Sequence, residues 1–234
     1  MRIDTDFSLY GVMILLSLLG GAVGVYILNI YSGIQRKVAR YLGIFSMVTS
    51  CFGGFLLTFV TSGFQEMGLS SLGGLMGMYA AVLAVSLIVN YQKIGGRMAV
   101  HTTLVLPLMY SIGKLGCFGA GCCRGIPYDG ICSVTYTGQF ASEGGVFPIQ
   151  LAESVVFFLI FCVGLYCYAR QKQYAAPIIF ILSAVMKFLL EFLRESHIGQ
   201  TISLTQILCG ICALIGCVWL WMVRSKTNGT AEKI

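Results

Sequence analysis

Long apolar stretches alternate with short polar connections along almost the whole chain. Apolar runs occur at about 8–30, 41–62, 73–91, 98–113, 148–168, 175–193 and 202–223. These lengths are close to the roughly 17–25 residues that cross the hydrocarbon core of a bilayer as a helix. The pattern predicts an all-α, polytopic membrane helix bundle of about seven transmembrane helices. We expect residues 1–234 to form a single integral membrane domain with an outer-face polar segment at about 114–147.

The charged residues predict how these helices are oriented. Short cytoplasmic loops of membrane proteins are enriched in Lys and Arg, and ten of the fifteen Lys and Arg residues lie in alternate connections or in the C-terminal tail. They are Arg36, Lys37, Arg40, Lys93, Arg97, Arg170, Lys172, Arg224, Lys226 and Lys233. This distribution predicts an N-terminus outside and a C-terminus in the cytoplasm. The net charge of +6 is explained by this topology, so we expect no nucleic acid among the partners.

The overall composition supports a membrane protein and excludes an ordinary soluble domain. Hydrophobic residues make up 57% of the chain and charged residues 10%, whereas soluble domains carry about 25% charged residues. The N-terminal sequence MRIDTDFSLYG lacks a basic segment followed by an apolar stretch and a small-residue cleavage site. We therefore expect the first helix to be retained.

Ionisable residues inside the predicted helices are the first candidates for function, because a charge in hydrocarbon is costly unless it is paired or faces water. Lys187, Glu191 and Arg194 follow an i, i+4, i+7 spacing and so share one face of the sixth helix. This face is either a functional polar stripe, or a neutral Lys–Glu pair beside an Arg that reaches the membrane interface.

A second polar pair opens the fifth helix. Gln150 and Glu153 lie about one turn apart in the sequence FPIQLAES. Glu153 is a candidate general base, and the alternative is a buried acid paired with Lys114 or Lys187.

The stretch GKLGCFGAGCCRG combines five glycines, three cysteines and two cations. Glycines such as Gly116, Gly121 and Gly125 remove side chains where the backbone packs closely or approaches a ligand. Lys114 and Arg124 supply positive charge that can hold an anion. The stretch suggests a site for a phosphate-sized anion near the outer leaflet, and close helix packing by small residues is the alternative.

Four cysteines of the outer segment are candidates for redox or thiol chemistry. Cys117, Cys122, Cys123 and Cys132 lie on the predicted outer side, where disulfides can persist. Their spacing, C-x4-C-C-x8-C, differs from the paired C-x2-C of ordinary structural zinc sites. A disulfide is therefore favoured over a metal, and we expect neither a metal nor another cofactor.

Six collinear stretches resemble the prolipoprotein diacylglyceryl transferases of bacterial membranes. GKLGCFGAGCCRG is similar to the family signature G-R-x-G-N-F-x-N-G-E-x-x-G, SLYGVM to W-Y-G-L-M, LSSLGGLMG to M-S-F-H-G-G-L-I-G, FPIQLAE to H-P-S-Q-L-Y-E, KFLLEFLR to R-F-x-x-E-F-x-R, and SLTQIL to S-x-x-Q-I-L. The stretches run in the same order as in the family and cover nearly the whole chain.

The chain departs from the family pattern at positions that carry chemistry. Lys114 and Lys187 stand where the family has two arginines thought to hold the lipid phosphate, and Leu72 stands where it has a histidine. Cys117 and Cys122 replace the Asn and Glu of the signature. Lysine keeps the charge of arginine but lacks the planar fork that fits a phosphate.

The resemblance implies transfer of a diacylglyceryl group from phosphatidylglycerol to the thiol of a lipobox cysteine, in the bacterial cytoplasmic (inner) membrane. The partners would be phosphatidylglycerol, membrane lipid and lipobox-containing preproteins. It suggests Tyr10, Glu153 and Glu191 as catalytic residues. The substrate-binding candidates are Lys114, Gly116, Cys117, Gly121, Gly125, Gln150, Lys187, Arg194 and Gln206.

Two other functions are open at the level of sequence. One is a cysteine-based membrane enzyme of thiol–disulfide exchange or acyl transfer, in which Lys114 and Arg124 activate a thiolate. Loss of activity in Cys117→Ser with tolerance of Lys114→Ala would distinguish it. The other is a non-catalytic relative that binds lipid or a partner protein, for which phospholipid would bind without a thioether product.

Overall fold

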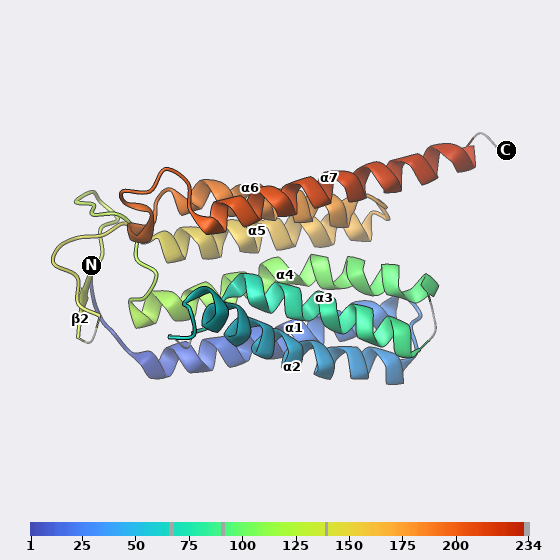
Figure 1. The fold of residues 1–234 in the computed structure, drawn as a ribbon, viewed down its shortest axis with the longest axis horizontal. Coiled ribbons are helices and arrows are strands. Elements are labelled where there is room, and N and C mark those ends of the chain that lie inside the picture. The colour runs from blue at the N-terminus through green and yellow to red at the C-terminus, as the bar shows by residue number, and fades with distance from the viewer. Residues whose placement is uncertain (66–67, 90–91, 139, 232–234) are drawn as a thin grey trace. The chain divides into compact units, whose positions relative to one another are not determined.

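Helices form almost all of the regular structure. The computed structural model describes residues 1–65, 68–89, 92–138 and 140–231, with the backbone alone for residues 92, 93 and 226–231. The elements within them are β1 (Arg2–Asp4), α1 (Phe7–Tyr31), α2 (Arg36–Thr61), α3 (Ser71–Ile88), α4 (Gln92–Ala120), β2 (Thr135–Thr137), α5 (Ile149–Ala169), α6 (Ala175–Glu191), a 3-10 turn (Glu195–His197) and α7 (Leu204–Ala231) (Figure 1). The predicted all-α bundle of seven helices is confirmed.

The helices follow the predicted apolar runs, but some extend beyond them: α4 begins at Gln92 and not at residue 98, and α7 ends at Ala231 and not at residue 223. Helix α4 also ends at Ala120 and not at residue 113, so Lys114 and Cys117 lie within a helix and not in the outer segment. The prediction ended the helix at the first charged residue. The Lys114 ammonium is instead paired inside the protein, so it does not interrupt the helix. Residues 90 and 91 of the third predicted run and Lys233 of the tail lie outside the described residues.

The helices have the length and surface of a multi-pass membrane protein. In the described part of the chain, α1, α2, α3, α4, α5 and α7 are long and apolar enough to cross a membrane. Helix α6 has 17 residues, or roughly 26 Å at 1.5 Å per residue, a little short of the ~30 Å hydrocarbon core. Large apolar side chains such as Val12, Val48 and Leu214 are exposed, as expected for surfaces that lipid covers. The orientation stays a prediction.

The chain divides into two compact units. One is formed by residues 1–16 and 110–234 and the other by residues 17–109. Helices α1 and α4 contribute to both units because each crosses a boundary between them.

In the unit of residues 17–109, α2 and α3 pack through glycines. A Cβ atom placed on Gly73 would lie 2.2 Å from the Gly53 carbonyl oxygen, and one on Gly77 would lie 2.0 Å from the Thr49 carbonyl oxygen. Small residues four apart allow the backbones of membrane helices to approach this closely. The glycines of LSSLGGLMG therefore set the distance between α2 and α3.

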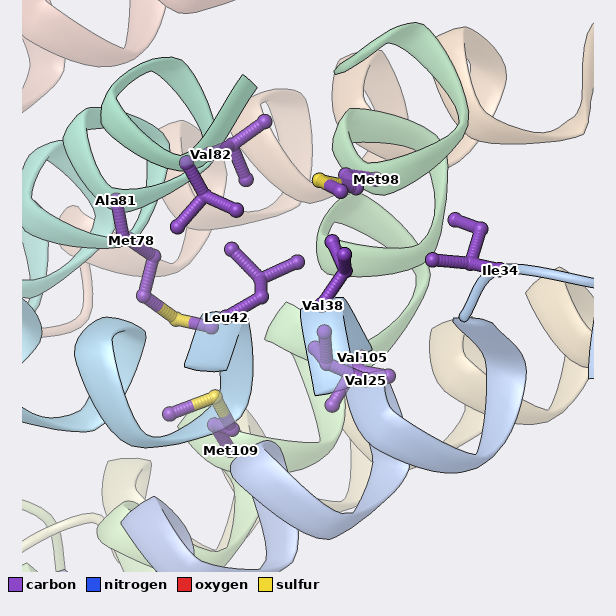
Figure 2. Packing of buried hydrophobic residues seen from close by; sticks show 11 residues of the cluster. Val25, Ile34, Val38, Leu42, Met78, Ala81, Val82, Met98, Val105 and Met109 are labelled. Atoms are coloured by element: carbon purple, nitrogen blue, oxygen red, sulfur yellow. The ribbon is translucent and has the colours of Figure 1, made fainter. Parts of the chain in front are cut away.

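An apolar core fills the same unit. Eleven buried side chains from α1 to α4 meet there, among them Val25, Leu42 and Met78 (Figure 2). A polar pair is buried in the unit as well, because His101 Nδ1 lies 2.7 Å from Asn29 Oδ1. Hydrogen bonding of this kind offsets the cost of burying polar groups.

In the unit of residues 1–16 and 110–234, α6 packs against both α5 and α7 (Figure 1). Strand β1 pairs in parallel with β2, with Arg2 opposite Thr135, and this fastens the N-terminus to the loop before α5.

Helix α7 begins with a capping box. Ser203 Oγ accepts a hydrogen bond from the Gln206 backbone N–H (3.2 Å), and Gln206 Oε1 accepts one from the Ser203 N–H (2.9 Å).

Gly77→Val is expected to lower the thermal unfolding midpoint in detergent, because overpacking against a backbone carbonyl costs about 1–3 kcal/mol. Loss of helical circular dichroism on heating measures the midpoint. Gly96→Val is the matched control, since a Cβ atom there meets nothing within 4 Å. Equal midpoints in the two variants would contradict the close α2–α3 contact.

Candidate active site

Glu153 is the centre of a buried cluster of charges. The residue is fully buried, and Lys114 Nζ lies 2.8 Å from its Oε2 and Lys187 Nζ 2.9 Å from its Oε1. Arg194 Nη2 lies 3.2 Å from Oε2, and the Tyr110 hydroxyl donates a hydrogen bond to Oε1 over 2.8 Å. One carboxylate therefore holds three cations and a phenol together.

Glu191 is the second carboxylate of the cluster. Its Oε2 accepts a short hydrogen bond from Lys187 and lies 3.4 Å from Arg194 Nε. The cluster contains three cations and these two carboxylates, so one positive charge is in excess. A buried charge without a partner is costly, and the cluster is therefore suited to bind one negative charge.

The positions of these residues follow from helical spacing. Lys187 and Glu191 lie four residues apart on α6, as the sequence predicts. The sequence left two interpretations of Glu153, a general base or a buried acid paired with a lysine. The structure agrees with the second, because Glu153 is buried and paired with both candidate lysines. Tyr110 was not predicted, although its i, i+4 spacing from Lys114 is the same signal that identified the α6 stripe.

The contacts of Glu153 favour a positioning role for this residue. A carboxylate offers about four acceptor directions, and four donors already contact its two oxygens. Arg194, by contrast, has a buried Nε that makes no hydrogen bond among the described residues and contacts Glu191 Oε2 only at 3.4 Å. Burial lowers the pKa of Arg194, but Tyr110 and Glu153 outweigh it and hold the pKa above its usual value. The guanidinium is therefore charged, and one of its N–H groups is held only loosely.

A left-handed turn follows α4 and brings three thiols together. Gly121 has a φ of +70° and Cys123 a φ of +54°, a conformation that costs a non-glycine residue about 1–3 kcal/mol. The Sγ atoms of Cys117, Cys122 and Cys123 all lie within 4.8 Å of one another. Cys132 is exposed and is not part of this group. All four cysteines are free thiols in the structure, so the prediction that favoured a disulfide among them is wrong.

The thiol group lies beside the charge cluster. Cys117 is one turn after Lys114 on α4. Hydrogen bonds from the Cys117 and Cys122 thiols, and then the positive charges of Lys114 and Arg194, lower the pKa of Cys123 well below its usual value. Cys123 is also the most exposed residue of the group.

Gln150 anchors the turn and leaves one polar atom unpaired. Its Nε2 donates to the Cys122 carbonyl oxygen over 2.8 Å, while its buried Oε1 has no hydrogen-bond partner among the described residues. The neighbouring Tyr136 hydroxyl is buried beside this amide, and burial raises the pKa of Tyr136 to about 12. Gln150 and Tyr136 are therefore neighbouring buried polar groups. Tyr136 was not predicted, because nothing distinguishes it within the loop sequence.

Two of the predicted glycines shape the backbone around the site. A Cβ atom on Gly116 would lie 2.8 Å from Met13 Cβ and 3.4 Å from the Tyr10 carbonyl oxygen. One on Gly125 would lie 2.3 Å from the Phe147 carbonyl oxygen. Close packing, the alternative interpretation of these glycines, therefore accounts for both. Tyr10 itself is half-buried on α1.

Two predicted polar residues have structural contacts. Gln206 is fully buried in the capping box of α7, and its Nε2 donates to the Phe188 carbonyl oxygen over 3.4 Å. Arg124 Nε lies 3.1 Å from Glu195 Oε2, and its Nη1 donates to the Ala141 carbonyl oxygen over 2.9 Å. Arg124 thus fastens the loop, whereas Lys114, Lys187 and Arg194 are the predicted cations that meet at Glu153.

Comparisons with known proteins point to one family. A family model described as "Prolipoprotein diacylglyceryl transferase" matches residues 2–222. A protein of Clostridium tetani (strain Massachusetts / E88) named phosphatidylglycerol--prolipoprotein diacylglyceryl transferase is 27% identical in an alignment of 224 positions that covers 86% of this chain and 90% of the relative. The family match includes every residue of the charge cluster.

Glu153→Gln is expected to destabilise the protein by about 3–5 kcal/mol, because removing one partner of buried ion pairs leaves the others uncompensated. Thermal unfolding in detergent measures the effect. Glu143→Gln, in the exposed loop before α5, is the control for loss of one negative charge. Equal stability of the two variants would mean that Glu153 is not the buried centre of the cluster.

Proposed function

The chain belongs to the prolipoprotein diacylglyceryl transferase family, and we propose that it transfers a diacylglyceryl group from phosphatidylglycerol to the lipobox cysteine of an exported prolipoprotein. The proposed location is the bacterial cytoplasmic membrane. The predicted orientation would put the charge cluster near the outer leaflet, where exported preproteins emerge.

One observation carries this proposal: the buried cluster has three cations for two carboxylates. The phosphodiester of phosphatidylglycerol has one negative charge, which matches the one positive charge in excess. Arginine and lysine are the side chains that bind phosphate oxygens best. Arg194 Nε, which makes no hydrogen bond among the described residues and lies 3.4 Å from Glu191 Oε2, is the donor proposed for this purpose.

The chemistry of transfer uses the same cations. A thiolate sulfur forms a bond to the terminal glyceryl carbon of the diacylglyceryl group, while the bond between that carbon and the phosphate oxygen breaks. The electron pair leaves with the phosphate, so the departing glycerol phosphate gains negative charge as the reaction proceeds. Fixed positive groups that meet charge developing in the transition state lower the barrier.

The residues divide into three roles. Lys114, Lys187 and Arg194 hold the phosphate, and Glu153 positions these cations. Gln150 has a buried Oε1 without a hydrogen-bond partner among the described residues, and this atom suits a hydroxyl group of the glycerol head.

The acceptor thiol must also lose a proton. Glu191 and Tyr10 are the remaining predicted residues for handling it. Glu191 contacts two cations of the cluster, and Tyr10 lies on α1 beside Gly116.

The direct test is mass spectrometry of a lipobox peptide after incubation with the purified protein in phosphatidylglycerol liposomes. A peptide that gains a diacylglyceryl thioether supports the proposal. An unmodified peptide contradicts it, provided that another member of the family modifies the peptide in the same liposomes. Phospholipid binding without product would favour the non-catalytic alternative.

Arg194→Ala and Lys187→Ala are each expected to lower the initial rate of thioether formation at least about tenfold, the low end of what loss of one electrostatic stabiliser costs. Arg194→Lys should recover part of the rate, because it keeps the charge and loses the fork. Arg170→Ala, at the exposed end of α5, is the control. Unchanged rates in both alanine variants would remove the phosphate site from this cluster.

A further inference from the structure

Cys117, Cys122 and Cys123 form a set of donor atoms that the proposed phosphate site does not use. Their Sγ atoms lie within 4.8 Å of one another. Zinc–sulfur bonds of about 2.3 Å place the sulfurs of a tetrahedral site about 3.8 Å apart, so small side-chain rotations bring the three thiols onto one ion. Thiolates select soft cations such as Zn²⁺ over Mg²⁺ or Ca²⁺.

Contacts on both sides hold this set in place. Cys117 lies in the last turn of α4, and Gln150 of α5 binds the Cys122 carbonyl oxygen over 2.8 Å. The carbonyl oxygen of Arg124 accepts a hydrogen bond of 3.0 Å from the Glu195 backbone N–H. The turn with the two neighbouring cysteines is thus fastened to α5 and to the segment after α6.

The set is open on one side. No fourth Cys, His, Asp or Glu belongs to the group among the residues that the structure describes. The group extends from the buried Cys117 through the half-buried Cys122 to the exposed residue Cys123. Structural zinc sites have four protein ligands, whereas catalytic ones have three and an open position.

We propose that the three cysteines bind Zn²⁺ and that the acceptor cysteine of the prolipoprotein occupies the fourth position as a thiolate. The second part rests on the proposed function. A thiol that binds zinc gives up its proton, in this case to solvent, so the reaction does not need Glu153 as a base. This agrees with the four donors that already contact the Glu153 oxygens.

The step balances without an oxidant or reductant. The zinc-bound sulfur supplies the electron pair of the new sulfur–carbon bond, and the pair of the broken carbon–oxygen bond leaves on glycerol phosphate. The product thioether is neutral and a weaker ligand than a thiolate, so it leaves the zinc. The three protein thiolates stay bound and the site is ready for another acceptor.

Cobalt titration of the full chain tests the site. We expect the reduced, metal-free protein in detergent to bind one Co²⁺ with thiolate-to-cobalt charge-transfer absorbance, and Zn²⁺ to displace it. Cys123→Ser and Cys117→Ser should each weaken Co²⁺ binding at least about tenfold. Loss of an outer-shell partner already lowers metal affinity about 10–100-fold, and loss of a ligand should cost no less. Cys132→Ser, outside the group, should bind like the unmodified chain. Absence of thiolate bands, or equal binding by all three variants, would overturn the site.

A lipobox peptide tests the fourth position without any phosphatidylglycerol present. A cysteine peptide should increase the charge-transfer absorbance of the cobalt-loaded protein, whereas the same peptide with serine should not. An equal response to the two peptides would overturn the acceptor position. A cysteine-specific response in a protein that forms no thioether in liposomes would support the site and count against the proposed function alone.

Discussion

The ion pairs of Glu153 are the interaction on which the rest of the site depends. A carboxylate withdrawn from water this completely is tolerated only with cations and donors around it, and Glu153 has Lys114, Lys187 and Arg194 within 3.2 Å. These partners come from α4, α6 and the segment after α6, so the same contacts that satisfy the charge also draw three parts of the chain to the start of α5. The arrangement serves folding and function together, since it fixes the cations before a ligand arrives. Preorganised charge of this kind does not need to reorganise during a reaction.

Backbone geometry provides the second constraint. Gly116 lets α4 meet α1 closely and Gly125 lets the loop lie against the Phe147 carbonyl. Between them, the left-handed conformations of Gly121 and Cys123 return the chain over the last turn of α4. Three thiols, the buried Gln150 amide and the charge cluster thus belong to one neighbourhood of the unit formed by residues 1–16 and 110–234. The glycines of the signature act by shaping the chain, and the polar side chains between them are the ones for which we propose a role in the chemistry.

Much of this could be predicted from the sequence, because hydrocarbon imposes strict rules on helix length and on charge. The apolar runs predicted the seven helices. The spacing of Lys187 and Glu191 predicted that they share a helix face, and their side chains are in contact. The sequence could not decide between a base and a paired acid for Glu153, since that depends on which helices meet. The sequence-based prediction also ended α4 too early. The sequence does not show whether a lysine is paired inside the protein or lies at the surface. Tyr136 has no such signal at all, because only the fold of the loop brings it to Gln150.

Two neighbouring sites are thus proposed in one protein. One is a cationic site for the lipid phosphate, and the other is a thiol-lined site for the acceptor. The most direct test of the central claim is an experimental structure of the protein in phosphatidylglycerol nanodiscs. The account predicts density for the lipid phosphate within hydrogen-bond distance of Arg194 and of Lys114 or Lys187, with Glu153 still paired to the cations. A phosphate bound elsewhere, with the Glu153 cluster closed and empty of lipid, would contradict it.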